Sequence, residues 1–289
     1  MKKIRKAVIP AAGYGTRFLP VTKSVAKEMI PIIDTPTIEY IVREAMDSGI
    51  EEFLIIVSSN KNSIVDYFDN NFELEYQLKQ KGKLEELKQI TDLPRKLNIH
   101  FIRQHEQLGL GHAVLHAKEF VGDEPFALLL GDDVYVGNRK PALLQLIDAY
   151  NQTGSSILGT LNVADEDVSK YGICKPVPNQ KGRVQKLESV VEKPKLEDAP
   201  SNLAIGGRYI LTPTIFKYLQ NQTRGAGNEI QVTDSILRMM AEEDVYSMEI
   251  DGRRYDIGSK LGFIQATIDF ALKRDDLKDG VLEILKNIK

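Results

Sequence analysis

Short apolar runs alternate with amphipathic stretches through the first half of the chain, and this alternation restricts the folds open to it. Four runs rich in β-forming residues occupy positions 7–12, 53–58, 99–104 and 126–130, and helical patterns lie between them. A succession of strand, helix and strand implies right-handed crossovers, which build a parallel sheet with helices on both faces. The sequence therefore predicts an α/β fold, a three-layer sandwich around a mainly parallel central sheet.

The remaining segments modify this plan. Residues 72–96 are charged and helix-prone, so we expect an inserted helical pair there, on the surface. After a helix at 141–153 the chain becomes rich in shorter strands. These are expected at 156–163, 171–175, 183–192, 204–211 and 245–256. Residues 261–288 form a helical region, in which Leu282, Ile284 and Leu285 offer an apolar face to the body or to a partner subunit.

A chain of 289 residues is near the upper limit for one hydrophobic core. We therefore expect one domain over residues 1–289. Its larger part is 1–140, which contains the insertion near 72–96, and a smaller, strand-rich part follows at 141–260. The C-terminal helices at 261–289 complete it.

Charge and cysteine content exclude several classes of protein. The net charge of −3 gives no general attraction to nucleic acid or to a membrane surface, so an anionic ligand must be held by a local cluster of cations. No apolar segment approaches the roughly 20 residues of a membrane span. Cys174 is the single cysteine, which excludes an internal disulfide and favours a reducing compartment. The protein is expected to be cytoplasmic.

A glycine-hinged loop follows the first predicted strand and leads into cations. Gly13 and Gly15 allow backbone N–H groups to turn toward an anion, and Arg17 and Lys27 can neutralise several phosphate oxygens. This combination suits a nucleoside triphosphate. The loop matches neither of the common phosphate-binding loops, because Phe18 stands where the third glycine of Gly-x-Gly-x-x-Gly would be. A tight turn without a ligand is the alternative interpretation.

Two acidic positions follow predicted strands. Asp132 and Asp133 come directly after the strand at 126–130, and such a pair is a good ligand for Mg²⁺, which takes one or two carboxylates and completes its shell with water and phosphate. A turn with solvated carboxylates explains the pair equally well. Asp256 lies where a strand gives way to a helix, and on its own it fits a helix N-cap better than a metal ligand.

Further polar groups fall just past strand ends. Gln104 and the glycine-containing segment 108–112 can read the hydrogen-bonding edge of a base, although a flexible helix entry is the alternative. Glu192 can accept hydrogen bonds from sugar hydroxyls and Lys193 can hold a phosphate, although most such pairs are simply solvated. In parallel sheets ligands bind at the carboxyl ends of the strands, so one crevice can hold the Gly13 loop, Gln104 and Asp132.

Several ordered segments together closely resemble the sugar-1-phosphate nucleotidyltransferases, and within them the bacterial uridylyltransferases that act on glucose 1-phosphate. The match spans nearly the whole chain, and the insertion at 74–96 resembles the uridylyl branch. The segments that carry the resemblance are 11–20, 27–29, 107–114, 131–133, 191–194, 206–209, 229–234 and 255–260. The resemblance implies a Rossmann-like nucleotide-diphospho-sugar transferase fold.

The resemblance also implies an activity and roles for individual residues. The uridylyl group of UTP would pass to glucose 1-phosphate with Mg²⁺, giving UDP-glucose and pyrophosphate without a covalent enzyme intermediate, in a homodimer or larger homo-oligomer. Residues 1–140 would bind the nucleotide and 141–260 the sugar. The implied nucleotide-binding residues are Ala11, Ala12, Gly13, Gly15, Thr16, Arg17, Lys27, Gln104, Gly109 and Asp132. The implied sugar-phosphate residues are Gly172, Glu192, Lys193 and Gly207. Asp132 and Asp256 would hold the metal, and the implied catalytic residues are Arg17, Lys27, Asp132 and Lys193.

Three alternatives stay open at this point. A thymidylyltransferase, or a uridylyltransferase for another hexose 1-phosphate, uses the same residue types. A nucleotide-sugar sensor without activity would be favoured by loss of Lys27, Asp132 or Asp256, all of which are present. A nicotinamide oxidoreductase also begins with a strand and Gly-x-Gly, but the missing third glycine counts against it.

Overall fold

The computed structural model describes residues 1–288, and the predicted α/β fold is confirmed. Within these residues the largest sheet has nine strands in the order β5-β4-β1-β6-β11-β8-β12-β10-β9. They are β1 (Lys6–Pro10), β4 (Glu52–Val57), β5 (Asn98–Arg103), β6 (Phe126–Leu129), β8 (Ser156–Asn162), β9 (Gly172–Pro176), β10 (Val184–Glu192), β11 (Leu203–Leu211) and β12 (Val245–Glu249). The sheet is mixed, because β10 and β11 run opposite to the rest, whereas β5, β4, β1 and β6 are parallel as predicted.

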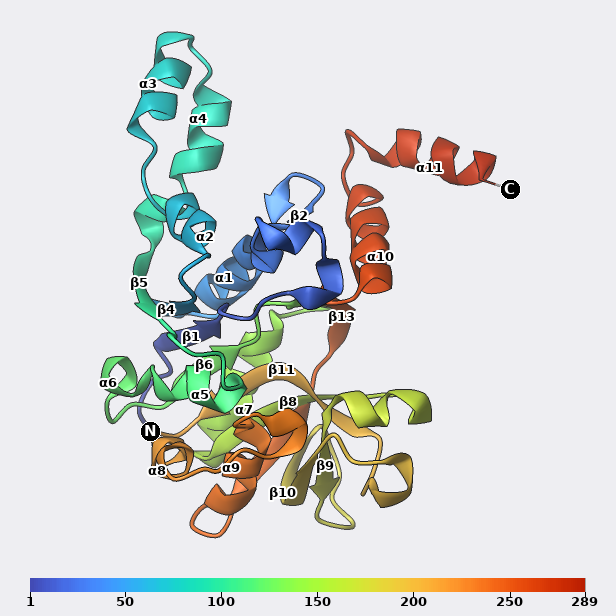
Figure 1. Ribbon diagram of the computed structural model, residues 1–289. Coiled ribbons are helices and arrows are strands. Elements are labelled where there is room, and N and C mark those ends of the chain that lie inside the picture. The colour runs from blue at the N-terminus through green and yellow to red at the C-terminus, as the bar shows by residue number, and fades with distance from the viewer. Residues whose placement is uncertain (289) are drawn as a thin grey trace.

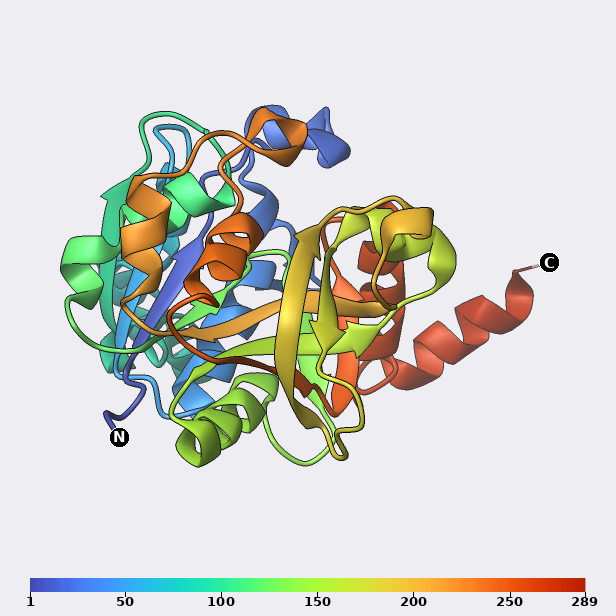
Figure 2. The same ribbon diagram turned by 90° about the horizontal axis from the view of Figure 1, so that it is seen from below.

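Helices cover both faces of this sheet (Figure 2). One face carries α1 (Thr37–Asp47), α2 (Asn62–Tyr67) and α7 (Ala142–Thr153), and the other carries α5 (Leu110–Leu115), α6 (Lys118–Val121), α8 (Ile215–Gln220) and α9 (Val232–Met239). Successive side chains of a strand point to opposite faces. Accordingly Ala7 and Ile9 of β1 join the core under α1, while Val8 joins the core under α9. The three-layer sandwich follows from this double burial.

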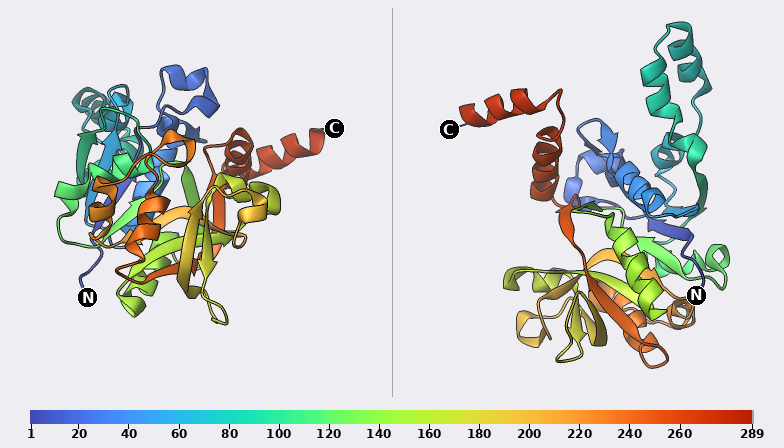
Figure 3. Two further views of the ribbon diagram at one scale, coloured as in Figure 1. Left: turned by 60° about the horizontal axis from the view of Figure 1, so that its bottom comes forward. Right: turned by 180° about the vertical axis from the view of Figure 1, so that it is seen from behind.

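Two helical appendages project from the body (Figure 1). The hairpin of α3 (Phe72–Gln80) and α4 (Leu84–Thr91) is the predicted inserted pair. At the other end of the chain, α10 (Lys260–Ala271) packs on the body, whereas α11 (Lys278–Asn287) extends away from it in both views of Figure 3. Among residues 1–288, every helix is too short or too polar to cross a lipid bilayer.

A two-stranded ribbon replaces part of one predicted strand. The strand-rich segment expected at 245–256 contains two strands in the structure. The chain leaves β12, turns, and continues as β13 (Gly252–Asp256), which pairs with the unforeseen β7 (Asp133–Gly137). A Cβ at Gly252 would lie 2.7 Å from the backbone oxygen of Val136, so only glycine allows β13 and β7 to pair this closely at that position. The ribbon places Asp256 opposite Asp133.

Two smaller differences complete the description. The helical pattern between the strands at 99–104 and 126–130 forms two short helices, α5 and α6. The short strands β2 (Pro31–Ile32) and β3 (Thr35–Pro36) form a hairpin against which α10 packs.

Candidate active site

A cleft of about 600 Å³ opens at the carboxyl ends of β1, β5 and β6. Most of the residues expected to bind the nucleotide line it: Ala12, Gly13, Gly15, Thr16, Arg17, Lys27, Gln104, Gly109 and Asp132. Ala11 does not; its side chain is buried in the core and its N–H donates to the oxygen of Ile56. Asp256 and the four expected sugar-phosphate residues also lie outside the lining of this cleft.

Glycine geometry shapes the loop after β1. Gly15 has φ +66°, and a Cβ there would lie 3.1 Å from side-chain atoms of Lys27 and Thr22. The hydroxyl of Thr22 donates to the Gly15 carbonyl at 2.8 Å, which fixes the turn into a 3₁₀ helix at Thr16–Phe18. At Gly13, by contrast, a Cβ would meet nothing within 4 Å. The open α-carbon of Gly13 therefore leaves room for a ligand to approach the backbone.

The opposite wall is built from two segments far apart in sequence. Gly109 has φ +112°, and a Cβ there would lie 2.7 Å from the carbonyl of Ile230. That carbonyl accepts from the N–H of Gly111, and the Ile230 N–H donates to the Leu108 carbonyl, both at 2.7 Å. Gln104 is buried, with its side-chain nitrogen 2.9 Å from Nδ1 of His112. This wall is therefore a rigid set of amides suited to reading a base edge.

Cations and an acid meet at the floor of the cleft. Lys27 donates to Oδ2 of Asp132 at 2.6 Å, and the Arg17 guanidinium lies 3.6 Å from the same oxygen. Burial opposes both charges, but the Lys27 charge and hydrogen bond, with help from Arg17, hold the pKa of Asp132 below its ordinary value. For Lys27, burial lowers the pKa and the charges of Asp132 and Glu28 more than offset it, so the net shift is upward. Both groups are thus charged at neutral pH.

Asp256 reaches this floor from β13. The point that a Cβ on Gly258 would occupy lies 2.8 Å from Oδ2 of Asp132, 3.0 Å from Oδ1 of Asp256 and 3.1 Å from Nη2 of Arg17. Within residues 1–288, no three Asp, Glu, His or Cys side chains lie close enough together to hold a metal ion by themselves. Two converging carboxylates fit Mg²⁺, which completes its shell with water and substrate phosphate. The donor set therefore suits a hard divalent ion.

The expected sugar-phosphate residues gather around β9, β10 and β11. Glu192 pairs with Gly172 across β10 and β9, and a Cβ on Gly172 would lie 3.2 Å from Oε2 of Glu192. Lys193 follows with φ +46°, is 42% exposed, and has Nζ 3.3 Å from Oε1 of Glu192. Gly207 has φ +75°, and a Cβ there would lie 2.3 Å from Oδ2 of Asp133. Each of the two glycines therefore leaves space for a carboxylate.

A buried charge network beside these residues was not foreseen from the sequence. Its members come from one helix, three strands and the residue before β9: Glu44, Asp133, Arg208, Arg254 and Tyr171. Arg208 is fully buried, donates to both carboxylate oxygens of Glu44, and donates at 2.6 Å to the Asp133 carbonyl. Arg254 binds Oδ1 of Asp133 through Nε at 2.6 Å and Nη2 at 2.5 Å. Burial, opposed by Arg254, raises the pKa of Asp133 to about 6.

A second unforeseen pair, Glu28 and Lys61, lies at the base of the cleft, which Glu28 helps to line. Glu28 is fully buried, its Oε2 accepts from Lys61 at 2.8 Å, and its Oε1 has no hydrogen-bond partner among the described residues. Burial raises the pKa of Glu28 despite Lys27 and Lys61. The position of Glu28 directly after Lys27 was the only available signal, and nothing in the sequence singled out Lys61.

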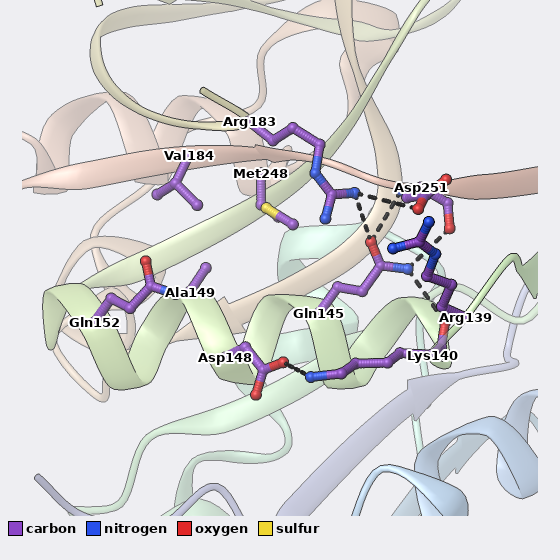
Figure 4. Close-up of a pocket in the computed structure, with 10 residues that line it drawn as sticks. All are labelled: Arg139, Lys140, Gln145, Asp148, Ala149, Gln152, Arg183, Val184, Met248 and Asp251. Atoms are coloured by element: carbon purple, nitrogen blue, oxygen red, sulfur yellow. Dashed lines mark hydrogen bonds and ion pairs between the residues drawn. The ribbon is translucent and has the colours of Figure 1, made fainter. Parts of the chain in front are cut away.

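A separate hollow of about 370 Å³ lies between α7 and the turn after β12 (Figure 4). Arg139, Lys140 and Arg183 line it, but Lys140 pairs with Asp148 and Arg183 bonds to Gln145. None of the expected site residues lines this hollow. The residues expected to bind the nucleotide therefore gather in the cleft at the strand ends and not in this hollow.

The family follows from comparison with known proteins. Residues 6–272 match the family described as Nucleotidyl transferase, which is most of the chain. The chain belongs to this family, whose members generally use a divalent metal ion. An α/β sheet that holds cations, converging carboxylates and an amide-lined wall at its carboxyl edge agrees with that membership.

Individual relatives are more specific. A UTP–glucose-1-phosphate uridylyltransferase of Staphylococcus haemolyticus is 52% identical over 291 residues, which cover 100% of this chain and 99% of the relative. A UTP-bound UGPase from Acinetobacter baumannii superposes with a TM-score of 0.91 at 39% identity and covers 99% of this chain and 100% of its own. A UDP-glucose pyrophosphorylase complexed with UDP-glucose gives 0.86 at 42% identity, with coverages of 94% and 100%.

Proposed function

We propose that this chain transfers the uridylyl group of UTP to glucose 1-phosphate and releases UDP-glucose and pyrophosphate. The observation that carries this proposal is the convergence of Arg17, Lys27 and Asp132 at the floor of an amide-lined cleft, with Asp256 beside them. Full-length relatives near 50% identity carry that activity in their names, and solved relatives are described with UTP and with UDP-glucose. Residues 1–140 would hold the nucleotide and residues 141–260 the sugar, within one domain that spans residues 1–289.

Repulsion between anions is the main barrier to this reaction. An oxygen of glucose 1-phosphate must attack the α-phosphorus of UTP while pyrophosphate leaves from the opposite side. Two unit charges about 4 Å apart repel by on the order of 4 kcal/mol at an effective dielectric of 20, so several cations are needed. Arg17 and Lys27 supply charge beside the triphosphate, and Lys193 supplies it beside the sugar phosphate. The nucleophile is already ionised, so the protein needs no general base.

We propose Mg²⁺ as the metal, with Asp132 and Asp256 as its protein ligands. When bound, Mg²⁺ neutralises charge on the α-phosphate. In the structure Lys27 engages Oδ2 of Asp132, so this lysine holds the carboxylate in place and is itself positioned to reach a phosphate oxygen. Arg17, 63% exposed, is free to follow the triphosphate. Catalysis then rests on orientation and charge stabilisation.

The sugar would be held by groups on β9, β10 and β11. Glu192 is the acceptor for sugar hydroxyls, Lys193 is the cation for the phosphate, and Gly172 and Gly207 would contact the sugar through their backbone groups. The left-handed backbone of Lys193 turns the chain immediately after the last paired residue of β10. Its ammonium group lies beside the Glu192 carboxylate, which agrees with a site where both residues meet the sugar phosphate.

The test is a grid of nucleoside triphosphates against sugar 1-phosphates with Mg²⁺, scored by pyrophosphate release. We expect the largest kcat/KM for UTP with glucose 1-phosphate. Faster release with dTTP, or with another hexose 1-phosphate, would replace the proposed substrate. No release with any pair, together with tight UDP-glucose binding, would make the protein a sensor. Asp132→Asn serves as the inactive control.

We also propose that the chain forms a homodimer or larger homo-oligomer through its C-terminal helices. Leu261 and Ile264 of α10 and Ile284 of α11 are more than half exposed, and α11 stands apart from the body (Figure 3). A second copy would remove these apolar side chains from water. Sedimentation should show a dimer or larger species for the wild type and a monomer for Ile284→Asp. A monomeric wild type would contradict the proposal.

We propose a cytoplasmic location for the protein. The buried, free Cys174 supports it, because free thiols are typical of a reducing compartment.

A further inference from the structure

Arg254 connects the acids of the cleft floor with the segment that carries Lys193. It lies on β13 two residues before Asp256, and its side chain is only 13% exposed. Two of its nitrogens bind Oδ1 of Asp133, the residue after Asp132. Its third nitrogen donates to the hydroxyl of Tyr171 at 3.0 Å, and the guanidinium lies 5.1 Å from the centre of that ring. All three nitrogens are therefore engaged within the protein.

Tyr171 passes this contact on through its backbone. Its carbonyl accepts from the N–H of Lys193 at 2.9 Å, immediately beyond the pairing of Glu192 with Gly172. Lys193 has φ +46°, a conformation that is uncommon for residues other than glycine and persists only where the surroundings enforce it. The bond from Lys193 to Tyr171 is one of the contacts that enforce it. A continuous path thus runs from Asp133 through Arg254 and Tyr171 to Lys193.

We propose that Arg254 is a positioning residue, which sets the distance between the metal-binding acids and Lys193. This inference rests on the proposed function, because it takes Lys193 as the ligand of the sugar phosphate and Asp132 and Asp256 as the metal ligands. The metal-binding acids and Lys193 must be at the correct distance from one another for glucose 1-phosphate to attack the α-phosphorus in line. A misplacement of about 1 Å can lower the rate by about 100-fold. Because its three guanidinium nitrogens are bonded to Asp133 and Tyr171, Arg254 acts through these two residues.

The chemistry of the side chain explains why arginine is needed here. A guanidinium presents five N–H donors in a fixed plane, so it can bind Asp133 on one edge and Tyr171 on another at the same time. A lysine at this position keeps the positive charge beside Asp133 but offers a single donor atom. Arg254→Lys therefore separates the bridging role from simple charge neutralisation.

The experiment compares Arg254→Lys and Tyr171→Phe with wild type in steady-state kinetics. We expect KM for glucose 1-phosphate to rise about tenfold and kcat to fall in Arg254→Lys, with KM for UTP unchanged. Tyr171→Phe removes only the hydroxyl and should show the same selective shift at a smaller size. The double variant should resemble Arg254→Lys alone, because both changes cut one path. Urea unfolding of each variant measures any loss of stability separately.

The matched control is Arg253→Lys, one residue earlier on the same strand. Arg253 is half exposed, pairs with Asp269 at 2.8 Å, and is expected to leave both KM values unchanged. Equal changes in the two KM values for Arg254→Lys, or wild-type kinetics in Tyr171→Phe, would overturn the positioning role while the proposed function stands. A wild type that releases no pyrophosphate from UTP and glucose 1-phosphate would overturn both.

Discussion

The cleft beside β1 and the buried charge network treat their charged groups in opposite ways. In the cleft, Lys27 and Arg17 share one acid, Asp132, and remain partly open to solvent. In the network, Arg208 and Glu44 are buried in the interior, and their charged groups bind one another and the backbone. The same residue types therefore serve a ligand in one region and the fold in the other.

The two regions also use glycine differently. Gly13 in the cleft leaves empty space, whereas Gly207 beside the network leaves space that the carboxylate of Asp133 already fills. The cleft is therefore open to a ligand, whereas the charged groups of Arg208 and Glu44 are already bonded within the protein. Substitutions of Arg208 or Glu44 should therefore change stability first, and substitutions in the cleft should change catalysis first.

The largest effect is expected from Arg208→Met in the network. The change leaves the Glu44 carboxylate buried without its partner, which typically costs about 3–5 kcal/mol in the free energy of unfolding. Urea denaturation measures it directly. Arg17→Met, at a mostly exposed cation of the cleft, should stay within about 0.5 kcal/mol of wild type. Equal stability losses in the two variants would remove the distinction between the regions.

The next effect is expected from Asp132→Asn in the cleft. We expect kcat to fall by about 10²- to 10³-fold, as for other groups that stabilise transition-state charge, with the unfolding midpoint little changed. Asp256→Asn should behave in the same way, and both variants should need more Mg²⁺ for half-maximal activity. Asp148→Asn, in the hollow beside α7, is the control and should be fully active. Near-normal turnover in either active-site variant would refute the metal assignment.

Gly207→Ala and Gly13→Ala give a smaller but sharper test. A side chain at Gly207 must adopt φ +75° and displace Asp133, so we expect a loss of about 1–3 kcal/mol in the free energy of unfolding. Gly13→Ala should melt like wild type but raise KM for UTP, because its methyl group enters the empty cleft. Thermal melts and KM values for UTP, measured for both variants, show which glycine is needed for the fold and which for the ligand. A destabilised Gly13→Ala would show that this loop is structural.

Local sequence patterns predicted the cleft well. The glycine loop, Arg17 and Lys27 are close in sequence, and Gln104 and Asp132 each follow an apolar strand whose direction the crossovers determine. Any sheet that runs parallel at this edge brings these residues together, so no detailed packing was needed. Ala11 is not among the residues that line the cleft, because strand-like pairing with Ile56 continues through it.

The network was beyond sequence reasoning because it depends on register between distant segments. Arg254 and Asp133 are 121 positions apart and meet only because β13 separates from β12 and pairs with β7. Glu44 sits among helical residues whose pattern does not mark it as buried, and Arg208 is one charged residue within the buried strand β11. Neither charge reveals its partner until α1 and β11 are packed together.

The smallest change in stability and kinetics is expected for a substitution of Lys193, which lies in neither the cleft nor the network. Its side chain is 42% exposed and forms an ion pair with Glu192 at the surface, so removing its charge should lower the free energy of unfolding only slightly. Lys193→Met should raise KM for glucose 1-phosphate about tenfold, equivalent to about 1.4 kcal/mol of binding, and leave KM for UTP unchanged. Lys195→Met, two residues later and exposed, is the matched control. An unchanged KM for the sugar phosphate in Lys193→Met would mean that the phosphate is held elsewhere. The strand-rich half would then contribute sugar hydroxyl contacts alone, and the cations of the cleft would have to neutralise both substrates.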